Sequence, residues 1–134
     1  MEYKELIEKS KEAREFAYAP YSHFKVGAAL LAKNGKVYTG CNIENATFTP
    51  TSCAERTAFF KAISEGTMEF EAIAIVGGKE GELAPFCAPC GVCRQVMAEF
   101  CDSSFKLVLG TPEKFDVYGF DEVLPFVFNQ KDVL

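Results

Sequence analysis

The chain has 134 residues, of which 49% are hydrophobic, so it can bury the core of one compact domain but is short for two. Its formal net charge is −5 and its Lys and Arg residues are scattered, which argues against a polynucleotide partner, because phosphate binding needs a continuous positive surface. Residues 1–5 are charged and lack the apolar core of a signal peptide, and no apolar run reaches the length of a membrane span. We therefore expect one cytoplasmic domain over residues 1–134, with neither a nucleic acid nor a membrane as partner.

The amino-terminal part predicts a helix followed by a hairpin. Residues 2–17 place apolar side chains at helical spacing with Glu and Lys between them, which indicates an amphipathic helix that ends before Pro20. Residues 24–32 begin with alternation and become continuously apolar, as expected of a central strand. The dipeptide Asn34-Gly35 then predicts a tight turn into a returning strand over residues 37–42.

The remaining segments alternate between helices and strands. We expect strands over residues 71–77, 105–109 and 115–118, a helix that carries Glu55 and ends at Gly66, a helix containing residues 92–100, and a short helix over residues 121–126 capped by Asp121. Together with the hairpin, this order predicts a single-domain α/β/α sandwich. Its mixed five-stranded sheet has helices on both faces and begins with an antiparallel pair.

Cysteines at two predicted helix starts indicate a metal site. Cys53 lies two residues before Glu55, and Cys90 and Cys93 form a C-x-x-C sequence that follows a proline. A catalytic zinc has three protein ligands and an open position, whereas a structural zinc has four. Three thiolates and Zn²⁺ carry a formal charge of −1, so we expect two helix N-termini and Arg56 to supply compensating positive charge. Glu55 would then move protons during the reaction without binding the metal.

The other cysteines leave alternatives open. Cys87 could be a fourth ligand, in which case the site would be a closed, non-catalytic structural zinc module. The equal spacing of Cys87, Cys90 and Cys93 also resembles iron–sulfur ligation, although Cys101 does not follow the ferredoxin spacing. A disulfide framework is the weaker interpretation in a reducing compartment, and Cys41 and Cys101 are expected to be small buried hydrophobic residues.

Five segments, in order along the chain, resemble the small homotetrameric cytidine deaminases. They are residues 17–22, 24–30, 40–46, 53–58 and 89–95. The glutamate two residues after the first cysteine, followed later by Pro-Cys-x-x-Cys, also matches the signature of zinc-dependent nucleobase deaminases. The resemblance implies hydrolysis of the 4-amino group of cytidine and 2'-deoxycytidine, giving uridine or 2'-deoxyuridine and ammonia in pyrimidine salvage. It also implies one zinc ion per subunit and a homotetramer with shared active sites.

The same resemblance implies roles for further residues. Phe24 would stack near the pyrimidine, and Asn42 and Glu44 would hydrogen-bond the ribose hydroxyls. The backbone of Ala54 would contact the base, and the carbonyl of Ala88 would receive the leaving amine. Phe128 of a neighbouring subunit would close over the base. Arg56, by contrast, is placed beside the metal ligands by the charge argument above and not by the resemblance.

Some positions depart from the family pattern. Phe48 stands where many relatives have Tyr, and Ala88 replaces a more usual Ser or Thr. Cys87 is an additional thiol, and His23, the only histidine, has no assigned role. An alternative substrate is another amino-substituted pyrimidine nucleoside or an aminopyrimidine antibiotic.

Overall fold

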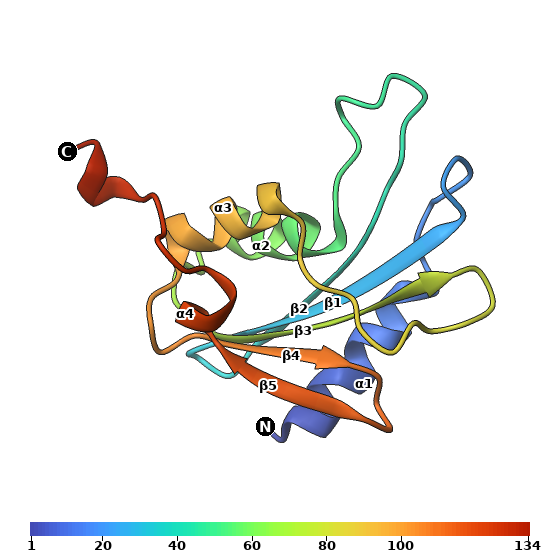
Figure 1. Cartoon of the computed structure of the whole chain (residues 1–134), viewed down its shortest axis with the longest axis horizontal. Coiled ribbons are helices and arrows are strands. Elements are labelled where there is room, and N and C mark those ends of the chain that lie inside the picture. Colours follow the sequence, from blue (N-terminus) through green and yellow to red (C-terminus); the bar gives the residue numbers. More distant parts are fainter.

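A mixed five-stranded sheet in the order β2-β1-β3-β4-β5 organises the computed structural model, which describes residues 1–134 (Figure 1). The elements are α1 (Tyr3–Arg14), β1 (Phe24–Ala32), β2 (Val37–Cys41), α2 (Ala54–Ser64), β3 (Phe70–Lys79), α3 (Gly91–Phe100), β4 (Lys106–Gly110), β5 (Phe115–Gly119), α4 (Phe120–Val123) and a 3₁₀ turn, η1 (Gln130–Asp132). Strand β1 is antiparallel to β2 and β3, β3 is parallel to β4, and β4 is antiparallel to β5. The predicted α/β fold with a mixed sheet is confirmed.

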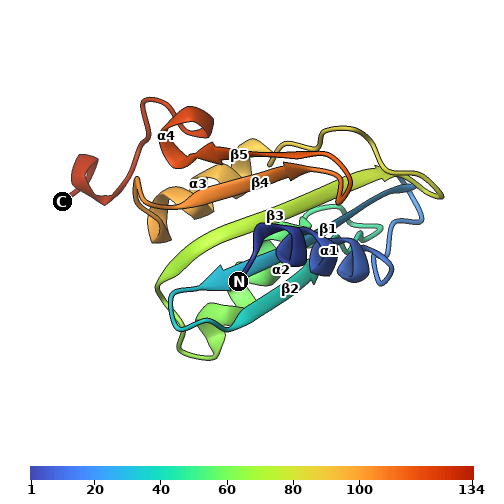
Figure 2. The same cartoon turned by 90° about the horizontal axis from the view of Figure 1, so that it is seen from below.

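Helices cover both faces of the sheet, which explains why the central strands are continuously apolar. Helix α1 lies on one face, and α2 and α3 lie on the other (Figures 1 and 2). Along β1, Ala28 and Leu30 join the core beneath α2 and α3, whereas Ala29 and Leu31 join the core beneath α1. Successive residues of a strand point to opposite faces, so both sets must be apolar.

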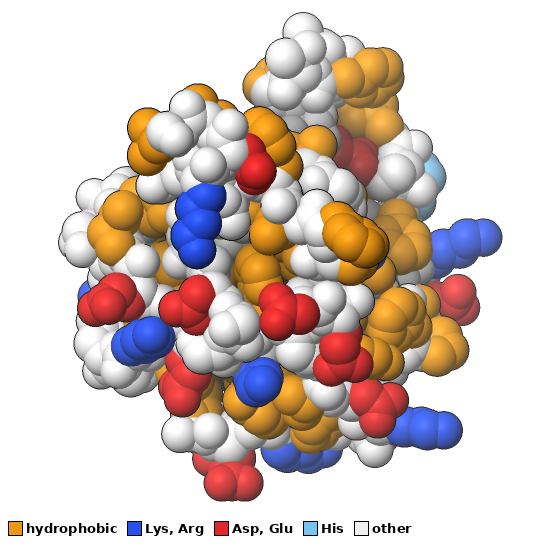
Figure 3. Space-filling model, turned by 60° about the vertical axis from the view of Figure 1, so that its left-hand side comes forward, with side chains coloured by type: hydrophobic (Ala, Val, Ile, Leu, Met, Phe, Trp, Pro, Cys, Tyr) orange, Lys and Arg blue, Asp and Glu red, His pale blue; other side chains and the backbone are white.

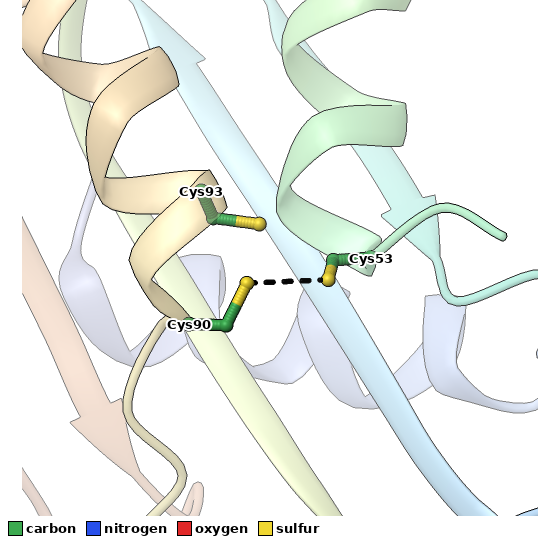
Figure 4. A group of neighbouring side chains, drawn as sticks. All are labelled: Cys53, Cys90 and Cys93. Carbon is green, nitrogen blue, oxygen red and sulfur yellow. Dashed lines mark hydrogen bonds between the residues drawn. The ribbon is translucent and has the colours of Figure 1, made fainter. Parts of the chain in front are cut away.

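The chain path brings α3 to the same face as α2. Strands β1 and β2 form the predicted hairpin, with Gly35 in the left-handed region at a φ of 90°. Strands β3 and β4 are parallel, so the chain between them crosses over one face of the sheet and forms α3 there. This crossover places Cys90 and Cys93 beside Cys53 at the start of α2 (Figure 4).

Two helix boundaries differ from the prediction. Helix α1 ends at Arg14. The N–H groups of residues 15–17 donate to carbonyls three residues back, in tighter turns, and the Tyr18 N–H then donates to the Asn42 carbonyl. The terminal helix is shorter than predicted and begins at Phe120, so Asp121 is not its cap. Gly119 is the N-cap, and its N–H donates to a carboxylate oxygen of Glu122 at 2.8 Å.

The surface of the molecule mixes the two signs of charge. Figure 3 shows acidic and basic side chains interspersed on the side that lies to the left in Figure 1, with hydrophobic side chains exposed between them. The exposed hydrophobic residues of the chain include Val92, Phe126 and Phe128. None of the helices has the length and apolar character needed to cross a membrane.

Candidate metal centre and active site

Three cysteine sulfurs from the starts of two helices lie close enough together to bind one metal ion. Cys53 is the N-cap of α2, Cys90 is the N-cap of α3, and Cys93 lies in the first turn of α3 (Figure 4). The three sulfurs lie within 4.8 Å of one another, and the Sγ atoms of Cys53 and Cys90 are 3.5 Å apart. A tetrahedral zinc with Zn–S bonds of about 2.3 Å requires sulfurs about 3.8 Å apart, so the cluster fits a zinc site.

The start of α2 can hold Cys53 in place because it packs directly on the backbone of β2. A Cβ atom on Gly40 would lie 2.7 Å from the backbone nitrogen of Ala58 and closer still to the carbonyl oxygen of Ala54. Glycine is therefore required for this close approach. The position of Cys53 thus depends on Gly40 of strand β2.

The start of α3 is held by Arg94. The Nε of Arg94 donates to the carbonyl of Pro89 at 2.9 Å, and its Nη1 donates to the carbonyl of Val123 at 2.6 Å. These bonds connect the residue before Cys90 to the end of α4. Both helix starts that carry the sulfurs are therefore anchored to other parts of the fold.

Cys87 is not a member of the metal-binding group. Its Sγ atom lies over Gly77 of β3, 2.6 Å from the point that a Cβ on that residue would occupy, and the Cε1 atom of Phe24 lies 3.2 Å from the same point. The sulfur group that could hold an ion contains Cys53 and the two cysteines of α3 only. The closed four-cysteine site considered from the sequence is therefore wrong, and the three-ligand interpretation, which leaves a coordination position free, agrees with the structure.

Positive charge lies beside the sulfurs. Nη2 of Arg56 donates to Sγ of Cys53 at 3.4 Å and to the carbonyl of Thr51 at 3.5 Å. A hydrogen bond from Cys93 and the guanidinium of Arg56 lower the pKa of Cys53 to about 5, whereas the hydrogen bond to Cys53 and burial raise the pKa of Cys93. The N-termini of α2 and α3 contribute about half a positive charge each. The surroundings thus favour the thiolate form of Cys53, the form that binds zinc.

Glu55 is a buried carboxyl group next to the sulfurs. It is 4% exposed in the first turn of α2. Burial raises its pKa to about 7, and the negative charge of Cys53 adds to this rise. A carboxyl group with such a pKa can both accept and release a proton near neutral pH.

Asn42 joins the end of β2 to the start of β1. Its Oδ1 accepts a hydrogen bond from the Val26 N–H at 2.8 Å, and its Nδ2 donates to the carbonyl of Phe24 at 2.8 Å. These bonds continue the pairing of the two strands beyond Cys41. The amide retains one N–H and one lone pair for another partner, such as a hydroxyl group.

Glu44 is held in a turn formed by the residues before β1. Its Oε1 accepts hydrogen bonds from the backbone N–H groups of Tyr21 at 3.0 Å and Ser22 at 3.1 Å, and its Oε2 accepts one from the Ser22 hydroxyl. The Ser22 hydroxyl, followed by these N–H groups, lowers the pKa of Glu44. The carboxylate is therefore charged and fixed in orientation.

The remaining predicted site residues differ in how close they lie to the sulfurs. Ala54 is fully buried at the first position of α2, next to Cys53. Ala88 is exposed, and its carbonyl oxygen accepts no hydrogen bond from the chain, so it is free for a donor. Phe128 lies along the outer side of α3, where its carbonyl accepts a hydrogen bond from Gln95 at 3.0 Å and its side chain is 60% exposed. The single chain does not bring the Phe128 ring into the sulfur cluster.

Two features near the site were missed in the sequence analysis. One is the turn of Tyr21 and Ser22 that holds Glu44, a segment whose residue pattern indicates no more than a loop. The other is Arg14, which is buried at the end of α1. A signal for Arg14 existed, since it lies four residues after Ser10 and seven after Ile7 and therefore on the buried face of the helix.

Comparisons with known proteins agree with this geometry. A family model described as the cytidine and deoxycytidylate deaminase zinc-binding region matches residues 1–109. The cytidine deaminase of Sporosarcina psychrophila is 50% identical over 99% of this chain and 96% of its own length, and that of Halalkalibacterium halodurans is 48% identical over 96% and 95%. The crystal structure of cytidine deaminase from Burkholderia pseudomallei superposes with a TM-score of 0.85 at 48% identity, covering 96% of this chain and all of that one. The chain therefore belongs to the zinc-binding cytidine and deoxycytidylate deaminase family.

Proposed function

We propose that this protein hydrolyses cytidine and 2'-deoxycytidine to uridine and 2'-deoxyuridine with release of ammonia, as a cytoplasmic enzyme of pyrimidine salvage. The observation that carries the proposal is the set of three clustered sulfurs with a buried carboxyl group beside them. The family and the named activity of the relatives support the choice of substrate. Cys53, Cys90 and Cys93 would hold the zinc ion, whose chemistry is to acidify water and so supply a nucleophile at neutral pH.

Glu55 is proposed to carry protons in this reaction. Hydrolysis adds the oxygen of water to C4 of the pyrimidine and releases the 4-amino group as ammonia. The two protons of water must therefore reach the ring nitrogen N3 and the leaving amine. Glu55 lies in the first turn of α2, two residues after Cys53, so its carboxyl oxygens can hold each proton between its removal from water and its delivery.

The residues at the ends of β1 and β2 are proposed to bind the nucleoside. Phe24 would stack on the base, while the free hydrogen-bonding capacity of Asn42 and Glu44 would be used for the ribose hydroxyls. The buried backbone of Ala54 and the free carbonyl of Ala88 would contact the pyrimidine edge and the leaving amine. In this arrangement Arg56 offsets the charge of the thiolates without touching the substrate.

A homotetramer with shared sites is proposed to complete the pocket. A cavity of about 370 Å³ between α1, β2 and α2 is lined by none of the three cysteines, and neither is the cavity beside the start of α3, which Gly91 and Phe128 line. Cys90 is exposed, and the segment after α4 projects from the body of the molecule with Phe126 and Phe128 exposed (Figure 1). A ring from a neighbouring subunit would cover the open side of the site, and Phe128 is the proposed residue.

The decisive experiment measures bound zinc and the loss of cytosine absorbance in the same sample. We expect turnover of cytidine and 2'-deoxycytidine. Cytidine monophosphate, a cytosine-containing single strand and an aminopyrimidine antibiotic should react poorly. If any of these three compounds reacts faster than cytidine, that compound replaces cytidine as the proposed substrate. A zinc-loaded protein that is inactive on all the compounds tested would refute the enzymatic assignment.

Light scattering tests the oligomer, and Phe128→Ala should raise KM if its ring is shared between subunits. An active monomer with an unchanged KM in that variant would refute shared sites.

A further inference from the structure

Arg14 is a buried cation without an acidic partner. It is 6% exposed, and no carboxylate forms an ion pair with it. Its Nε donates to the carbonyl of Lys25 at 2.9 Å, and its Nη2 donates to the carbonyls of Gly78 at 3.0 Å, Lys79 at 2.9 Å and Glu82. A buried guanidinium that bonds only backbone carbonyls fixes the path of the chain rather than neutralising a charge.

The carbonyls bound by Arg14 lie at the end of the β1–β3 ladder. Lys25 pairs with Gly78, and Phe24 pairs with Lys79 in the last rung. Arg14 therefore holds both strands next to Phe24, the residue proposed to stack on the base. It does so from α1, which lies on the face of the sheet opposite to α2 and α3 (Figure 2).

The backbone directly before Phe24 is strained. His23 has a φ of 59°, in the left-handed region that few non-glycine residues adopt, and its carbonyl accepts the Glu80 N–H at 2.8 Å. Such a conformation persists only when the surrounding structure enforces it. Here the His23 N–H donates to the carbonyl of Ala19 and the loop after β3 bonds the His23 carbonyl, and Arg14 binds the carbonyls of Lys79 and Glu82 on both sides of the latter bond.

The loop held by Arg14 also leads to the other wall of the proposed pocket. Its Ala84 N–H donates to the carbonyl of Gly77 at 2.8 Å, which folds the loop back against β3. The chain then continues to Cys87, whose sulfur lies over Gly77 together with the edge of the Phe24 ring. One side chain on the far face of the sheet thus fixes two segments that border the site.

We infer that Arg14 is a positioning residue that holds Phe24 and the loop of residues 79–84 in the arrangement required for nucleoside binding. This inference rests on the proposed function. The Phe24 ring would stack on the base equally well in the substrate and in the transition state. Displacement of the ring should therefore raise KM and leave kcat nearly unchanged.

The test compares Arg14→Lys and Arg14→Gln with Ser10→Ala in the full-length, zinc-loaded protein. Ser10 is a matched control because it is fully buried on the same helix one turn earlier and bonds only the carbonyl of Ile7 within that helix. We expect KM for cytidine to rise about five- to tenfold in the Arg14 variants, the effect of losing about one ordinary hydrogen bond, with kcat within about twofold of the parent. Ser10→Ala should lower the melting temperature without changing KM. Two Arg14 variants are used so that one remains informative if the other does not fold.

A double-mutant cycle with Phe24→Leu shows whether Arg14 acts through the aromatic ring. We expect Arg14→Lys to change KM by less than about twofold in the Phe24→Leu background, because the ring that it positions is absent. The same five- to tenfold change in both backgrounds, or an Arg14 variant that loses only thermal stability, would overturn the inference.

Hydrogen exchange separates this inference from the proposed function. In Arg14→Lys, the amides of residues 24–26 and 82–84 should exchange faster, whereas Ser10→Ala should leave them unchanged. If the parent protein proves inactive on cytidine, the proposed function fails, and the exchange pattern alone then decides whether Arg14 orders these segments. Unchanged exchange in the Arg14 variants would overturn the positioning role.

Discussion

Gly40 should control zinc affinity although it lies in β2 and binds no metal. In Gly40→Ala the added methyl would lie 2.7 Å from the backbone nitrogen of Ala58, where an ordinary contact begins at 3.4 Å, and closer still to the Ala54 carbonyl. The start of α2 must therefore move from the sheet by about 1 Å, at a cost of about 1–3 kcal/mol in the free energy of unfolding. For a domain of this size the melting temperature should fall by about 5–10 °C.

The same movement should weaken the metal site. Cys53 is the N-cap of α2 and moves with it, whereas zinc–ligand distances tolerate about 0.2 Å. We expect the zinc affinity of Gly40→Ala, measured by competition with a chromophoric chelator, to fall about 10–100-fold, as it does when residues that orient metal ligands are changed. Calorimetry or circular dichroism gives the melting temperature of the same samples.

Gly91→Ala is the matched control for this experiment. Gly91 follows Cys90 directly at the first position of α3, and a Cβ there would meet no atom within 4 Å. Alanine in a helix restricts the unfolded chain, so the variant should keep its zinc affinity and gain up to about 1 kcal/mol of stability. Equal zinc affinities of Gly40→Ala and Gly91→Ala would refute the argument that close packing of α2 on β2 places Cys53.

Three further predictions concern charge and protons. Glu55→Gln should retain zinc by elemental analysis and lose about 100- to 10,000-fold in kcat, and retained turnover would exclude the proton-transfer role. Arg56→Ala should reduce activity, and adding Cys53→His should restore part of it because a neutral ligand replaces an anionic one; a double variant that is worse than Arg56→Ala would show that the charge count is wrong. Ser22→Ala should raise the pKa of Glu44 toward its ordinary value in an NMR titration. Because the Glu44 pKa is lowered in the folded state, its contribution to stability is present above the unfolded pKa and lost as the pH falls through the folded value, and this loss should be smaller in Ser22→Ala.

Much of the fold and the sulfur cluster could be predicted because each depends on local signals. Asn34-Gly35 specifies a hairpin turn by its own backbone preferences, and cysteines at helix starts with C-x-x-C spacing indicate a shared metal even when they are far apart in sequence. The short terminal helix could not be placed in this way. Asp121 is a good N-cap by composition, but the Phe120 N–H donates to the Phe105 carbonyl, and this tertiary contact places the N-cap at Gly119, two residues earlier.

The role of Arg14 shows the limit of local signals more clearly. A basic residue in the last turn of a helix is ordinarily explained by the helix dipole. Its four acceptors come from β1, β3 and the loop after β3, and only the three-dimensional arrangement brings them together. Asn42 is similar, because its bonds to the start of β1 depend on the strand register and cannot be derived from residue spacing alone.

The distribution of the three sulfurs along the chain has a mechanical consequence. Cys53 and Cys93 are about 40 residues apart, and a metal that joins them closes the intervening chain into a loop. By the entropy of such a closure alone, a covalent bridge of this length would stabilise the fold by about 4 kcal/mol. Zinc would therefore be a reversible cross-link between the half of the molecule that contains the hairpin and the half that contains β4 and β5. Loss of the metal would then lower the stability of the fold as well as remove the activity.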